Sequence, residues 1–216
     1  PTGNFGDIFA GYVAKQMGLP IAQLMIATNI NDILARVLKT GTYKIGDVVA
    51  STSPSMDIQV SSNFERLLFE ATGRNAAEVC RLMRELTEKR KFSLSSNVLD
   101  VIRGSFAAER VDEVETAKII KDMFEKDGML LDPHTAVGYG AALRSDLPVS
   151  TPIVTLATAH PAKFPASVEK ACNRQAEEII DTPERVKVMM KQDETYETYP
   201  NDLAQVQDFI RQKKTD

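Results

Sequence analysis

Cysteine, histidine and long hydrophobic runs are all scarce in this sequence, and each shortage excludes a class of protein. The two cysteines, Cys80 and Cys172, are far apart, and neither belongs to a CxxC pair. This spacing is typical of a reducing compartment and argues against a disulfide framework or a zinc site. No apolar run reaches the length of about 20 residues that a membrane helix needs. We therefore expect a cytoplasmic protein with no metal site and no membrane partner.

A surplus of basic charge is also lacking. The chain has 26 lysines and arginines against 30 aspartates and glutamates, which gives a net charge of -4. The basic residues are scattered, whereas nucleic-acid-binding domains usually present a basic face. We therefore expect no nucleic-acid partner. The sequence gives no indication of the oligomeric state.

An initiating methionine and a signal peptide are absent as well. The sequence begins at Pro1, directly in front of a glycine-rich loop, where natural proteins rarely start. We therefore expect a fragment whose upstream half is missing.

The order of helical and extended patterns predicts an α/β fold. A helix is expected from about Asp7 to Met17, followed by an apolar run at 21–28 with the length of a buried parallel strand. A second helix should end near Lys39, and another short apolar strand is expected at 153–157. Such alternation is typical of a twisted, mostly parallel sheet with flanking helices.

Other segments depart from this alternation. Residues 42–60 predict an irregular loop, because they contain Gly46 and the run Ser51-Thr52-Ser53-Pro54-Ser55. Amphipathic helical periodicity prevails from 61 to 128, and the chain beyond Thr182 is charged. We therefore predict three parts: an α/β portion at 1–60 and 129–180, a mainly helical insertion at 61–128, and a C-terminal helical tail at 181–216.

The glycine-rich loop at 2–7, TGNFGD, precedes the first expected helix. The N–H groups at a helix N-terminus, together with the helix dipole, attract anions such as phosphate. Glycine lets phosphate approach the backbone and permits the positive φ that we expect here. The loop lacks the pattern of a nucleotide P-loop and the third glycine of a dinucleotide fingerprint. The alternative is a tight strand-to-helix turn capped by Asp7.

Two further groups of polar residues are candidates for a site. The segment SPSMDI at 53–58, followed by SSNFER at 61–66, is dense in hydroxyls and amides, which suits recognition of a phosphorylated amino acid. Its alternative role is a polar loop that caps a helix. The only histidines, His134 and His160, lie beside an expected helix start and strand end, where α/β sites form. Either histidine could instead be a helix cap or a core residue.

Six motifs in order resemble those of the threonine synthases, pyridoxal-phosphate enzymes of the tryptophan-synthase-like class, or fold type II. They are TGNFG at 2–6, ATNIND at 27–32, SPSMDI at 53–58, SSNFER at 61–66, DPHTAVG at 132–138 and ATAHPAKFP at 157–165. Together they cover most of residues 1 to about 169. The region after Thr182 carries no motif of this kind.

The resemblance implies an enzyme of threonine biosynthesis, a lyase that converts O-phospho-L-homoserine and water into L-threonine and phosphate. It also implies the cofactor pyridoxal 5'-phosphate. The backbone of Gly3, Asn4, Phe5 and Gly6 would hold the cofactor phosphate, and the Thr158 hydroxyl would meet the pyridine nitrogen. The candidates for substrate binding are Asn31, Asp32, Ser55, Asp57, His134, His160 and Lys163.

In the family, the lysine that binds the cofactor aldehyde lies upstream of the glycine loop. The resemblance therefore implies that no catalytic residue lies in this fragment, which would be inactive without its N-terminal half. Lys163 follows Thr158 too closely to be that lysine; it is a partner for an anion or a surface residue. Two alternatives stay open, a catalytically inactive threonine-synthase-like binding protein and another PLP-dependent elimination or replacement enzyme. The SPSMDI and ATAHPAKFP segments argue against the second alternative.

Overall fold

The structure is a computed structural model that describes residues 1–213. It divides into two compact units, Pro1–Ile180 and Asp181–Asp216. The second unit starts where the predicted C-terminal tail starts, and its helices α10 (Glu184–Met189) and α11 (Leu203–Lys213) are joined by an extended segment. Among the described residues, no helix combines the length and the apolar character needed to cross a membrane.

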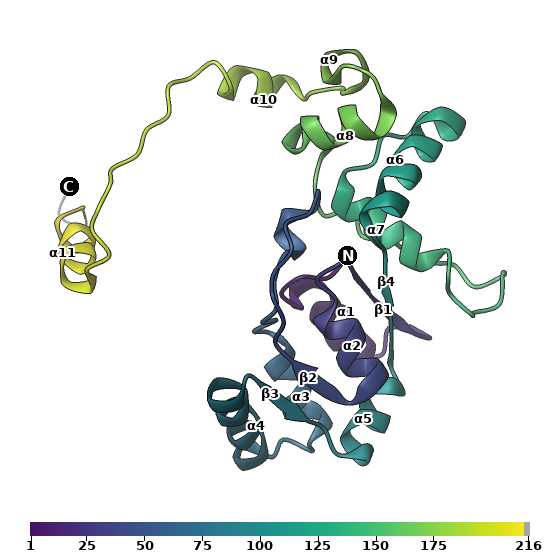
Figure 1. Cartoon of the computed structure of the whole chain (residues 1–216), viewed down its shortest axis with the longest axis vertical. Coiled ribbons are helices and arrows are strands. Elements are labelled where there is room, and N and C mark those ends of the chain that lie inside the picture. The colour runs from purple at the N-terminus through teal and green to yellow at the C-terminus, as the bar shows by residue number, and fades with distance from the viewer. Residues whose placement is uncertain (214–216) are drawn as a thin grey trace. The chain divides into compact units, whose positions relative to one another are not determined.

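A parallel pair of strands organises the first unit. β1 (Leu24–Thr28) pairs with β4 (Phe106–Arg110) (Figure 1). On the other edge of β1, the amide of Thr2 donates to the carbonyl of Ala27 at 2.8 Å. The glycine loop and α1 (Gly6–Gln16) therefore start beside β1.

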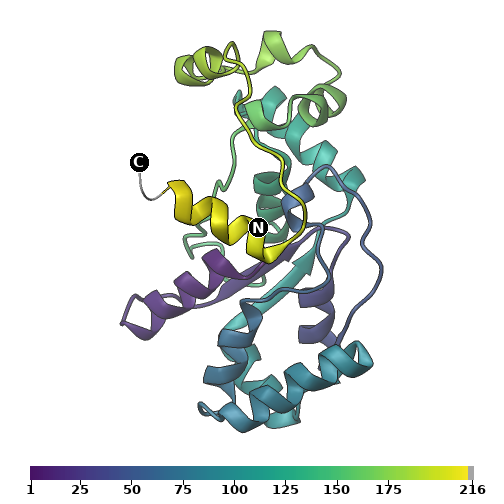
Figure 2. The same ribbon diagram turned by 90° about the vertical axis from the view of Figure 1, so that its left-hand side faces the viewer.

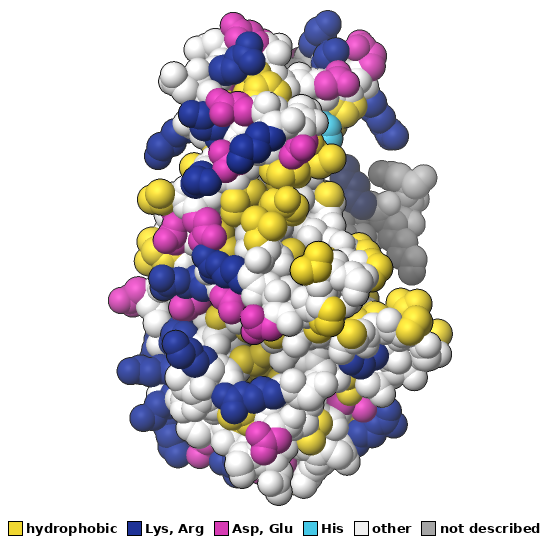
Figure 3. Space-filling model, turned by 90° about the vertical axis from the view of Figure 1, so that its right-hand side faces the viewer, with side chains coloured by type: hydrophobic (Ala, Val, Ile, Leu, Met, Phe, Trp, Pro, Cys, Tyr) yellow, Lys and Arg dark blue, Asp and Glu magenta, His cyan; other side chains and the backbone are white. Residues whose placement is uncertain are grey.

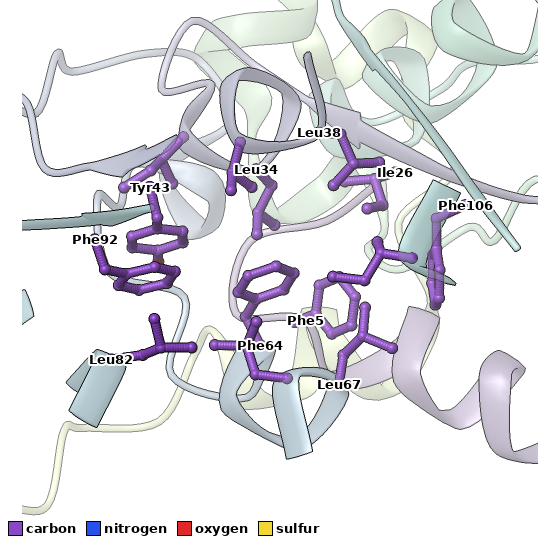
Figure 4. Close-up of a cluster of buried hydrophobic side chains, with 14 of the residues drawn as sticks. Phe5, Ile26, Leu34, Leu38, Tyr43, Phe64, Leu67, Leu82, Phe92 and Phe106 are labelled. Atoms are coloured by element: carbon purple, nitrogen blue, oxygen red, sulfur yellow. The ribbon is translucent and has the colours of Figure 1, made fainter. Parts of the chain in front are cut away.

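Aromatic and aliphatic side chains fill the core on one side of this pair (Figure 4). Phe5 lies 5.4 Å from Phe64 and 5.8 Å from Phe106, measured between ring centroids. Tyr43 stacks on Phe92 at 4.9 Å. The elements that supply this core are α2 (Ile33–Thr40), β2 (Thr42–Lys44), α3 (Phe64–Ala71), α4 (Ala76–Lys89), β3 (Lys91–Ser93) and α5 (Ser96–Arg103).

A second core forms between α6 (Glu113–Asp127), α7 (Pro133–Ala142) and α8 (Pro165–Cys172), with a short α9 (Ala176–Ile179) beside it. Eight of the ten residues of α7 are buried, because its small side chains let neighbouring elements approach closely. A Cβ on Gly140 would stand 2.7 Å from the Ile119 side chain. Helices α3–α5 gather at one end of the first unit and α6–α8 at the other (Figures 1 and 2).

Several predicted elements are confirmed by the structure. The first helix, the strand inside 21–28, the helix ending near Lys39 and the helix opening at Pro133 are all present. The segment 61–128 is mostly helical, but it also supplies β3 and β4, so it contributes a strand to the same sheet as β1. Residues 42–60 contain β2 and a 3-10 turn at Pro54–Met56 in addition to loop.

The strand predicted at 153–157 is not formed. This segment pairs with no strand in the described chain. A strand needs such a partner, because an isolated one leaves its N–H and C=O groups without hydrogen bonds. The large side chains of the segment are exposed, with Val154 83% and Ile153 52% accessible. Hydrophobic side chains are visible at the surface more widely, and Figure 3 shows a group of them in the middle of one face.

Candidate functional site

The first turn of α1 is not capped by a side chain. In α4 to α7 the residue before the helix is Asn75, Ser95, Asp112 or Asp132, and each of these side chains accepts from a backbone N–H group of the first turn. The residue before α1 is Phe5, which has no acceptor, and Asp7 lies inside the helix and does not cap it. Within the described residues, the amides at 4–7 donate no hydrogen bond. The positive end of α1 is thus open to an anion.

Positive φ in the glycine loop belongs to Phe5 and not to a glycine. Phe5 has a φ of 64°, whereas Gly3 and Gly6 are outside the left-handed region, so the expectation of a glycine with positive φ was wrong. The reason is tertiary, because the Phe5 ring is completely buried between Phe64 and Phe106. Burial of the ring offsets a strain of about 1–2 kcal/mol.

The two glycines of the loop have different surroundings. A Cβ on Gly3 would stand 2.6 Å from the carbonyl oxygen of Ser55, so this glycine permits close backbone packing. A Cβ on Gly6 would have no atom within 4 Å. Gly6 is therefore exposed, with open space beside it at the N-terminus of α1.

The SSNFER segment holds the glycine loop in place. The backbone amide and the hydroxyl of Ser62 donate to Asn4 Oδ1 at 2.6 and 2.8 Å. The hydroxyl of Ser61 donates to the Gly3 carbonyl at 2.9 Å, and its amide donates to Tyr43 Oη at 2.8 Å. The Asn4 side chain is thus engaged within the protein, which leaves its backbone for a ligand.

A polar network lies at the carboxyl end of β1, where ligands bind in open α/β sheets. Asp57 Oδ1 accepts from the side-chain amides of Asn29 and Asn31 at 2.7 and 2.9 Å and from the Ser51 hydroxyl at 2.6 Å. Asp57 Oδ2 accepts from the Ser51 amide at 2.8 Å. Two candidates for substrate binding, Asn31 and Asp57, are therefore brought together, and they fix the loop at 51–57.

Ser55 and His134 are also brought together. The Ser55 amide donates to His134 Nε2 at 3.2 Å, and His134 Nδ1 lies 3.0 Å from Asp132 Oδ1. His134 and Asp132 are almost fully buried, whereas Ser55 is exposed. Burial by itself raises the pKa of the Asp132 carboxyl, but hydrogen bonds from His134 and Thr135 outweigh this effect and lower its pKa below the ordinary value.

Thr158, His160 and Lys163 are all exposed. His160 caps the 3-10 turn Pro161–Lys163 by accepting from the Ala162 amide at 3.2 Å, and the Thr158 hydroxyl makes no hydrogen bond within the described chain. Their segment runs close to the glycine loop, since a Cβ on Gly138 would stand 2.8 Å from Pro1 and 3.0 Å from Thr155.

Asp32 belongs to a different surface. It pairs with Arg36 at 2.7 Å and with Arg110 at 3.7 Å, and it lines an open groove of about 720 Å³ along β4. Within residues 1–213, no group of three histidine, cysteine, aspartate or glutamate side chains is arranged to hold a metal ion.

Sequence reasoning did not single out Asn29 or Tyr43. Asn29 is fully buried and donates to Asp57 and to the Ser53 hydroxyl, and Tyr43 supports Ser61. Asn29 could have been found from the ATNIND motif at 27–32, which contains it. No local pattern marks Tyr43, because its role depends on a contact with a residue 18 positions away.

Comparisons with known proteins identify relatives of this chain. A family model described as "Threonine synthase, C-terminal" matches residues 135–210. The threonine synthase of Pseudomonas aeruginosa is 45% identical over 212 residues, which are 98% of this chain and 45% of that protein. The threonine synthase of Saccharomyces cerevisiae is 46% identical over 188 residues, 79% of this chain and 37% of that protein.

Solved structures show the same fold. A PLP-bound threonine synthase from Brucella melitensis is 51% identical with a TM-score of 0.89, and the match covers 98% of this chain and 45% of that one. This chain belongs to the threonine synthase family. The family and the α/β fold class predicted from the motifs are thereby confirmed. The chain spans about half the length of the threonine synthases that it matches.

Proposed function

We propose that this chain forms the phosphate-holding part of a PLP-dependent threonine synthase, which converts O-phospho-L-homoserine and water into L-threonine and phosphate. The observation that carries the proposal is the uncapped N-terminus of α1, with Gly6 facing open space. Pyridoxal phosphate, when bound, supplies an electron sink for charge that develops on the substrate.

The residues present fit the cofactor phosphate. Within the described residues the amides at 4–7 donate no hydrogen bond, a Cβ on Gly6 would meet open space, and Ser61 and Ser62 hold the loop by hydrogen bonds. A dianionic phosphate would satisfy these N–H groups and the helix dipole together. Thr158 is exposed and makes no hydrogen bond within residues 1–213, so it offers a neutral hydroxyl for the pyridine nitrogen.

The remaining candidates divide into contacting and supporting residues. Ser55 presents an exposed hydroxyl beside Gly3, and His160 and Lys163 are exposed on the segment that follows Thr158. We assign these three to the substrate, with Lys163 attracting its phosphate. Asn31, Asp57 and His134 are buried or bonded within the protein and support the site from behind. Asp32, which follows β1 and precedes α2, is assigned a supporting role. Its ion pair with Arg36 holds the turn that contains Asn31.

Removal of the substrate's α and β protons requires a base. The proposal assigns this role to a lysine in the portion of the protein that corresponds to the remaining length of the relatives. That portion would be the main partner of this chain. A cytoplasmic location is part of the proposal, since the free thiols Cys80 and Cys172 suit a reducing compartment.

We expect that the isolated 216-residue chain forms no covalent link with pyridoxal phosphate and does not turn over O-phosphohomoserine. The reason is that the proposal places the lysine that binds the cofactor aldehyde in the remaining portion of the protein and assigns Lys163 to anion binding. Borohydride reduction after soaking with pyridoxal phosphate, followed by peptide mapping, tests this. A stoichiometric adduct on Lys163 would contradict the assignment.

Assays of the full-length protein, meaning the complete translated product that contains this chain, distinguish the remaining alternatives. Release of threonine and phosphate from O-phosphohomoserine supports the synthase. Binding of pyridoxal phosphate without turnover supports an inactive binding protein. Turnover of a different phosphorylated amino acid alone supports another elimination or replacement enzyme.

Thr158→Val in the full-length protein should weaken cofactor binding modestly, by about fivefold, because it deletes one hydrogen bond of about 1 kcal/mol. Turnover of the Thr158→Val variant should fall further than its cofactor affinity. Thr158→Asp should change the absorbance spectrum of the bound cofactor, because a carboxylate favours a protonated ring nitrogen. Because Thr158 is exposed, both variants should keep the free energy of unfolding within about 0.5 kcal/mol. Unchanged spectra with parallel losses of stability and rate would exclude the pyridine contact.

A further inference from the structure

We infer that Asp132 and His134 form a latch that positions Ser55 against the glycine loop, so that the affinity of the loop for phosphate depends on His134 Nε2. In this role His134 is a positioning residue, which needs no contact with cofactor or substrate. The inference rests on the proposed function in one respect, namely that pyridoxal phosphate is the ligand whose affinity changes.

Three motif segments meet on the imidazole of His134. The Ser55 amide, from SPSMDI, donates to Nε2 at 3.2 Å. Asp132, from the motif that contains His134 itself, lies 3.0 Å from Nδ1. Phe164, from ATAHPAKFP, packs on the ring with 4.7 Å between centroids. The ring therefore joins segments that are far apart in the sequence.

The hydrogen bonds fix the tautomer of His134. A backbone N–H group can only donate, so Nε2 must carry a lone pair and the ring proton must be on Nδ1. That proton points to Asp132 Oδ1, which also accepts from the His134 amide at 2.9 Å. The other carboxylate oxygen accepts from the Thr135 hydroxyl. Asp132 thus orients the ring so that Nε2 faces Ser55.

The Ser55 peptide transmits this orientation to the glycine loop. Its amide is bonded to His134, and its carbonyl oxygen stands 2.6 Å from the position of a Cβ on Gly3. On either side, Ser53 is bonded to Asn29 and Asp57 is bonded to Asn31. Loss of the Nε2 contact should therefore release the Ser55 peptide while its neighbours stay anchored.

The test compares two substitutions in the full-length protein. The carbonyl of Gln can reach the position of Nε2 and accept from Ser55, whereas Asn reaches only as far as Nδ1 and leaves the Ser55 amide unpaired. We expect His134→Asn to weaken binding of pyridoxal phosphate about tenfold, as loss of a buried hydrogen bond does, and His134→Gln to weaken it about threefold at most. Val168→Ala, in the same core, is the control for a general loss of stability.

A second measurement does not require the cofactor. In the cofactor-free protein, hydrogen exchange of the Ser55 amide should be faster in His134→Asn than in His134→Gln, and unchanged in Val168→Ala. Equal exchange in the two histidine variants, or an equal loss of affinity in all three variants, would overturn the latch. If the unmodified protein binds no pyridoxal phosphate, the proposed function fails, and the exchange rates still decide whether the latch exists.

Discussion

Gly6→Val in the full-length protein is expected to weaken the binding of pyridoxal phosphate at least about tenfold and to leave the fold intact. A Cβ on Gly6 would meet no atom of a neighbouring element within 4 Å, so we expect the folded state to accept the side chain. It would occupy the space in front of the α1 amides and prevent charge-assisted hydrogen bonds to phosphate, each worth about 1.5–3 kcal/mol. Titration of the apo protein measures the affinity.

Ala76→Val is the matched control, because Ala76 is also the first residue of an exposed helix start, in α4. It should leave cofactor affinity unchanged. Equal affinity in the Gly6 and Ala76 variants would make the glycine loop a simple turn. Gly3→Ala should behave differently from both, because its Cβ would collide with the Ser55 carbonyl and lower stability.

Phe5→Ala is expected to lower the free energy of unfolding by about 3–5 kcal/mol, since it removes a fully buried aromatic ring. Phe5→Gly should be less destabilising than Phe5→Ala by about 1 kcal/mol, because glycine adopts the φ of 64° without strain. Denaturant unfolding of the three proteins measures both differences.

The opposite order of glycine and alanine is expected at an ordinary helical position. Ala77, exposed in α4, supplies the control, and Ala77→Gly should cost about 0.5–1 kcal/mol. A Phe5→Gly variant less stable than Phe5→Ala would mean that the left-handed conformation of Phe5 carries no strain.

The sequence predicted the helices better than the strands, for a physical reason. A helix satisfies its own backbone, so local signals suffice to end it: Gly41 and Gly128, both with positive φ, follow α2 and α6 directly. A strand depends on a partner elsewhere in the chain. β4 has little apolar patterning of its own and forms because β1 lies beside it. The more apolar segment 153–157 has no strand partner among the described residues.

The motifs pointed to segments that the structure brings together, but they did not separate residues with free side chains from residues that support the loops. Asn4, Asn31 and Asp57 carry functional groups that could face a ligand, yet their side chains bond to other parts of the protein. Ser55 is the reverse case, with a bonded backbone and an exposed hydroxyl. Such distinctions depend on the direction in which a side chain points after folding, and the spacing of residues in the sequence does not give that direction.

The pairing of β1 with β4 has a consequence for how the chain folds during synthesis. Thr28 and Glu109, in contact across this pair, are 81 residues apart, and Asn4 and Ser62 are 58 apart. Closing such long loops costs entropy before any contact repays it, which makes folding slow. Within the described chain, the glycine loop leaves the ribosome before the segments that support it. The proposed phosphate site should therefore stay unformed until residue 62 and the strand at 106–110 have emerged.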